Sequence, residues 1–72
     1  MRSEMLPHQQ RVIDEKNELV ERITKLKAFF TTEMFVNLGT EDKQLLQRQC
    51  IVMQGYAGIL EQRISRFSNP QE

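Results

Sequence analysis

A lysine within an apolar row is the residue whose type and spacing most readily suggest chemistry. The row consists of Val12, Lys16, Leu19, Ile23, Leu26 and Phe30, at alternating spacings of four and three residues. This spacing is typical of the seam along which one helix packs against another. An ammonium group in such a seam costs free energy unless its stem reaches water or it meets an anion. Two interpretations therefore stay open for Lys16: a snorkelling side chain at the wet end of the seam, and a phosphate contact.

Other polar residues could complete an anion site or a base-reading site. His8, Gln9 and Arg11 precede Lys16 by no more than about two helical turns. Arg48 and Gln54 lie on the polar side of a second helical segment, where they could meet a phosphate or the edge of a nucleobase, and Tyr56 could stack on a base. Each also has a structural interpretation, since exposed Arg and Gln often form a solvated face and tyrosine often packs.

The residue inventory gives no support to catalysis. The chain has one histidine, His8, and one cysteine, Cys50, far apart in sequence. A nucleophile, a base and an orienting group must converge, and a structural zinc site needs four ligands. Cys50 falls on an apolar row, as a small core residue would. The sequence therefore predicts no enzyme, no metal site and no cofactor.

Two glycines lie inside the second helical segment. Gly55 and Gly58 are three residues apart, and each costs about 1 kcal/mol relative to alanine in a helix interior. Close approach of another helix is the commoner explanation, and close approach of a flat ligand is the other.

The elements that must position these residues are two helices. Pro7 suits the first position of a helix over about residues 7–32. A connection over about 33–40, containing a short helical turn, leads to a second helix over about 41–67, and the tail 68–72 is expected to fray. The second helix carries one apolar row of Leu46, Cys50, Met53, Ala57, Leu60, Ile64 and Phe67. Beside it lies a second row of Leu45, Gln49, Val52, Tyr56, Ile59 and Arg63.

These patterns predict an all-α fold, a single antiparallel two-helix hairpin spanning residues 1–72. The two adjacent rows make an apolar face wider than one partner helix covers. A chain of 72 residues buries only about 60 % of its unfolded surface, and one cysteine cannot form an internal disulfide. We therefore expect the hairpin to assemble into a symmetric oligomer.

Charge and hydropathy exclude several classes of protein. Ten Lys and Arg balance ten Asp and Glu, so the chain lacks the basic surface on which DNA-binding domains rely. No stretch approaches the roughly 20 apolar residues of a membrane span, and Met1–Gln10 contains no apolar run typical of a signal peptide. A cytoplasmic protein is the plain expectation.

Two segments carry a resemblance to a known family. "PHQQRVIDEKNELVERITKLKAFF" and "EDKQLLQRQCIVMQGYAGILEQRISRF" resemble small bacteriophage proteins of the anti-CBASS and anti-Thoeris helical-hairpin family, over about residues 6–67. The core of the resemblance runs from Ile13 to Leu19 and from Met53 to Leu60. The N-terminal aromatic segment expected of the family is replaced here by His8, Gln9 and Gln10.

The resemblance implies a non-catalytic sponge in the cytoplasm of an infected bacterium. Such proteins form symmetric homo-oligomers, often hexamers, that sequester cyclic di- and trinucleotides or cyclic ADP-ribose isomers between protomers. It implies ligand contacts at Lys16 and, within one residue of register, at Arg48, Gln54 and Tyr56. An alternative is a helical adaptor or inhibitor that docks on a host protein through the second row.

Overall fold

The computed structural model describes residues 6–67, and those residues form three helices and no strand. Helix α1 spans Pro7–Phe29, α2 spans Glu33–Val36 and α3 spans Thr40–Phe67. The prediction of an all-helical fold is thereby confirmed for this part of the chain. The predicted frayed tail, residues 68–72, lies outside the described residues. None of the three helices is long and apolar enough to cross a membrane.

The first turn of α1 is capped by its own neighbours. Pro7 occupies the first helical position, where its missing N–H would have had no partner within the helix. The backbone N–H of Leu6 donates to Oε1 of Gln9 at 3.2 Å. This bond holds the chain at the start of the helix and fixes the orientation of the Gln9 amide.

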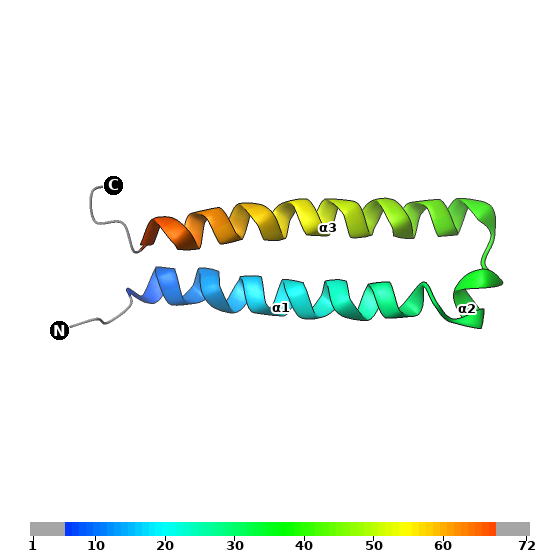
Figure 1. The fold of residues 1–72 in the computed structure, drawn as a ribbon, viewed down its shortest axis with the longest axis horizontal. Coiled ribbons are helices and arrows are strands. Elements are labelled where there is room, and N and C mark those ends of the chain that lie inside the picture. Colours follow the sequence, from blue (N-terminus) through cyan, green and yellow to red (C-terminus); the bar gives the residue numbers. More distant parts are fainter. Residues whose placement is uncertain (1–5, 68–72) are drawn as a thin grey trace.

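Helices α1 and α3 lie side by side and run in opposite directions (Figure 1). The described chain is an elongated body of 54 × 17 × 15 Å. The row of α1 that contains Lys16 and the row of α3 from Leu46 to Phe67 form the seam between the helices. Every residue of these two rows is buried or half-buried. The most buried members are Val12, Leu19, Ile23, Cys50, Ala57 and Leu60, with Leu60 fully inaccessible. The three-and-four spacing therefore identifies the faces that meet.

The connection between α1 and α3 is organised by threonine hydroxyls and phenylalanine rings. Thr31 and Thr32 donate from their hydroxyls to the carbonyls of Ala28 and Phe29, each at 2.7 Å. The Thr32 hydroxyl also accepts from the backbone N–H of Phe35 at 3.2 Å, which caps α2. Because these bonds compete with continued helix, α1 ends at Phe29 rather than near residue 32.

Phe35 packs the connection against the end of α1. Its ring lies 4.9 Å from that of Phe30 and 6.0 Å from that of Phe29, centroid to centroid. The Lys43 ammonium lies 5.9 Å from the Phe35 centroid, which ties the first turn of α3 to the same cluster. The chain then enters α3 with the Gly39 carbonyl accepting from the N–H of Lys43 at 3.0 Å.

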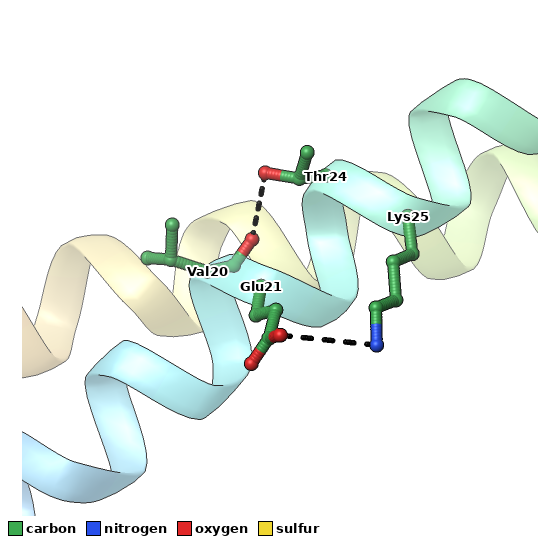
Figure 2. A network of polar contacts seen from close by, with 4 residues as sticks. All are labelled: Val20, Glu21, Thr24 and Lys25. Carbon is green, nitrogen blue, oxygen red and sulfur yellow. Dashed lines mark hydrogen bonds and ion pairs between the residues drawn. The ribbon is translucent and has the colours of Figure 1, made fainter.

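The outer surface of α1 is stabilised only by local contacts. Figure 2 shows the Thr24 hydroxyl donating to the Val20 carbonyl at 3.0 Å, and Lys25 pairing with Glu21 at 3.8 Å. An exposed pair of this kind contributes about 0.3–0.5 kcal/mol. The seam must therefore supply most of the stabilisation.

We predict that Leu60→Ala lowers the free energy of unfolding by about 2–5 kcal/mol, because it leaves a cavity at a fully buried position of the seam. Ile51→Ala, at a side chain that is 67 % exposed on the same helix, should change it by less than about 0.5 kcal/mol. Urea unfolding followed by circular dichroism, at equal protein concentrations, measures both. Equal losses in the two variants would contradict the seam.

Candidate functional site

Lys16 lies where the seam row places it, half-buried between two buried apolar residues of α1. Val12 and Leu19, its neighbours in the row, are each only 7 % exposed. Among the residues that the structure describes, no hydrogen bond or ion pair involves the Lys16 ammonium. The charge therefore sits at the edge of an apolar seam with its donors unused, which leaves it available to an anion.

Tyr56 makes a side-chain hydrogen bond that joins α3 to α1. Its hydroxyl donates to Oε2 of Glu15, the residue next to Lys16. The hydrogen bond, together with partial burial and the negative charge of Glu15, raises the pKa of Tyr56 above its usual value of 10.0, while the positive charge of Arg63 opposes this shift. The tyrosine ring is thus held against α1 while 40 % of the residue stays exposed.

The contact defines one side of the helix pair. Glu15 and Tyr56 each come one position before a seam residue, Lys16 and Ala57, so both flank the seam on the same side. By the helical repeat, His8 and Arg11 fall on this side of α1 and Arg63 on this side of α3. His8 and Arg11 are exposed, whereas Gln9 is half-buried and uses its Oε1 to cap α1.

Arg48 and Gln54 lie apart from that group. Arg48, Gln44, Gln47 and Ile51 line a shallow depression of about 370 Å³ on the outer face of α3. Tyr56 of α3 lies level with Glu15 of α1. Since the helices run in opposite directions, Arg48, eight residues before Tyr56, lies level with Ile23. This level is about 22 Å along the axis from that of His8. Gln54 is exposed and follows the depression on the next turn. One copy of the chain therefore does not gather all the predicted site residues in one pocket.

The second row remains open to solvent. Leu45 is 56 % exposed, Val52 70 %, Tyr56 40 % and Ile59 55 %. Apart from Gln49, these exposed side chains are largely apolar and follow one line along α3, and such a line is typical of a surface that binds another molecule.

The two glycines of α3 are not required by the packing of α1 against α3. A Cβ added at Gly55 or at Gly58 would meet no atom within 4 Å. The space beside these glycines therefore permits the close approach of a molecule outside this chain.

Sequence reasoning missed Glu15 as a site residue and placed Arg63 only in the second row of the second helix. The signal for Glu15 was its position beside the seam, on the side that Tyr56 occupies on the other helix. That signal can be used only when it is known which residues of α1 lie level with which residues of α3. The spacing of the rows does not give this register.

Comparison with known proteins places the chain among phage proteins. Residues 6–66 match a protein family described as Sequestin. The chain is 36 % identical over 63 residues to an uncharacterized 7.5 kDa protein from the denB–rIIB intergenic region of Enterobacteria phage T4, a match covering 88 % of this chain and 98 % of the relative. Comparison with solved structures finds no match. The expected resemblance to a family of small phage proteins is confirmed.

We predict that Tyr56, the one tyrosine in the chain, titrates above pH 10.0, and that Glu15→Gln shifts its pKa back toward that value. Since the folded pKa exceeds the unfolded one, the contact stabilises the fold below pH 10.0 and is lost as pH rises through the folded pKa. Phenolate absorbance during an alkaline titration measures both variants. An unchanged pKa in Glu15→Gln would contradict the hydrogen bond.

We also predict that Gly55→Ala and Gly58→Ala each raise the free energy of unfolding of the helix pair by about 0.5–1 kcal/mol, because the new methyl groups meet open space. Thermal unfolding measures this. A loss of stability at either position would show that another molecule, such as a second copy, packs closely there.

Proposed function

This chain belongs to the Sequestin family, and we propose that it is a non-catalytic protein that sequesters nucleotide second messengers of bacterial immunity. The messengers are of the cyclic di- and trinucleotide or cyclic ADP-ribose class, bound in pockets between copies of the chain. The family's name supports a sequestering role, and the relative from phage T4 supports action in the cytoplasm of an infected bacterium.

Lys16 is the observation that carries the proposal. Its ammonium has no partner among the described residues, at the edge of an otherwise apolar seam, so a ligand anion gives its presence a reason. A phosphate oxygen accepts charge-assisted hydrogen bonds from such a group, and these are about twice as strong as neutral ones. The hydroxyl of Tyr56 is held by Glu15, the residue before Lys16. The Tyr56 ring therefore lies beside the same stretch of α1, where a nucleobase can stack on it.

Symmetric assembly reconciles a cationic pocket with a neutral chain. Ten basic and ten acidic residues leave no net charge on one copy. In a symmetric assembly, every copy contributes its own Lys16 or Arg48. A few positive charges per chain therefore place several positive charges around one compact dianion. A sponge neutralises its ligand only mole for mole and must bind tightly: a Kd of about 1 nM corresponds to about −12 kcal/mol.

The positions of the reactive side chains support binding without turnover. Cys50 is only 5 % exposed and lies in the seam. His8 lies in the first turn of α1, about 20 Å along the axis from the level of Cys50. Within one copy, these two groups are too far apart to act on one substrate. Sequestration needs neither group to react.

We predict that one class among cyclic dinucleotides, cyclic trinucleotides and cyclic ADP-ribose isomers raises the melting temperature of the protein. A ligand that binds only the folded assembly stabilises it by RT ln(1 + [L]/Kd). Lys16→Ala should abolish most of the shift. Lys16→Met, which keeps an unbranched stem in the seam, should abolish it equally while preserving the ligand-free melting temperature.

Lys25→Ala is the matched control, because Lys25 lies on the outer face of α1 with a side chain that is 76 % exposed. It should retain the full ligand shift. A panel that shifts no melting temperature would contradict the proposed function. Equal shifts in wild type and Lys16→Met would remove Lys16 from the site.

A further inference from the structure

Two apolar residues of the second row, Leu45 and Ile59, lie symmetrically about Val52, seven residues before and after it. Glu41 and Arg63 lie eleven residues before and after it. Intervals of seven and eleven residues are close to two and three helical turns, so all five residues lie along one line on the helix surface.

We propose that the second row is covered by the second row of another copy, with the two α3 helices antiparallel and related by a two-fold axis at Val52. In that arrangement Leu45 of each copy meets Ile59 of the other, and Val52 meets its own counterpart. This pairing of α3 helices would be an interface of the oligomer that the proposed function assumes, and in that respect it rests on the proposed function.

Charge complementarity favours a second copy as the occupant. A two-fold axis at Val52 places Glu41 of each copy opposite Arg63 of the other, so an ion pair closes each end of the apolar row. Both residues are exposed in the single chain. A self-complementary patch of this kind is what a two-fold interface requires.

The proposed contact runs along most of α3. Glu41 and Arg63 are 22 residues apart, so the row that they bound is about 33 Å long. Tyr56 adds an aromatic anchor near the centre of the row. Since Glu15 already holds its hydroxyl, little side-chain freedom remains to be lost on association.

The same axis gathers residues that one copy keeps apart. Tyr56 lies four residues after Val52 and Arg48 four residues before it. Arg48 of one copy therefore lies level with Tyr56 of the other, within reach of its long side chain. The interface then presents a guanidinium and an aromatic ring together, the pair of groups that a nucleotide phosphate and base would contact.

The first experiment compares neighbouring substitutions by sedimentation without ligand. Val52→Glu places two carboxylates face to face on the axis and should raise the Kd of self-association by at least about a hundredfold. Ile51→Glu is the matched control, because it replaces an equally exposed β-branched residue about 100° around the helix. It should leave self-association unchanged. A monomeric wild type, or equal effects of the two variants, would overturn the interface.

Charge exchange tests the register. Glu41→Arg and Arg63→Glu should each weaken association by about tenfold, and the double variant should restore it. Failure of the double variant to recover would overturn the antiparallel register.

Cysteine cross-linking covers the case in which Val52→Glu fails to fold. In a Cys50→Ala background, Val52→Cys should oxidise to a covalent dimer and Ile51→Cys should not. Cross-linking at both positions, or at neither, would contradict the axis. These results do not depend on any ligand, so the interface and the proposed function can fail separately.

Discussion

The burial of one apolar row from each helix against the other is the interaction on which the rest of the structure depends. Two helices can cover only one face of each other, and here that face is the seam that contains the fully buried Leu60. Several apolar side chains outside the seam stay exposed, Val52 and Ile59 among them. The chain is therefore stabilised through one surface, and its other surfaces stay available for the assembly and ligand binding that we propose.

The sequence predicts the seam well because a row at spacings of three and four residues can face one way only along a helix. Even Lys16, the polar member, is half-buried as its place in the row requires. The end of α1 was harder to predict. Thr31 and Thr32 can continue a helix or bond to its last carbonyls, and the choice depends on Phe35 packing against Phe29 and Phe30. That packing joins residues of two different helices, so the periodicity of either helix does not reveal it.

The candidate site was predictable in part for a related reason. Lys16 is conspicuous within its own helix, so its pattern alone singles it out. The pairing of Tyr56 with Glu15 depends on how far α3 is shifted along α1, and the length of the connection sets that shift. Arg48 shows the limit most clearly, since its useful neighbours in our proposal belong to another copy. Single-chain periodicity carries no information about such contacts beyond the exposure of the second row.

The aromatic cluster at one end of the pair has a consequence for folding. Phe29, Phe30 and Phe35 are close in sequence, so their contacts close short loops and form early at small entropic cost. Contacts toward the opposite end, such as that of Glu15 with Tyr56, join residues 41 positions apart and form later. Folding should zip from the cluster toward the chain ends, and local opening should run the other way. Lys16 then lies in the half of the molecule that opens most readily, so the anion that we propose as its ligand would not need global unfolding to enter.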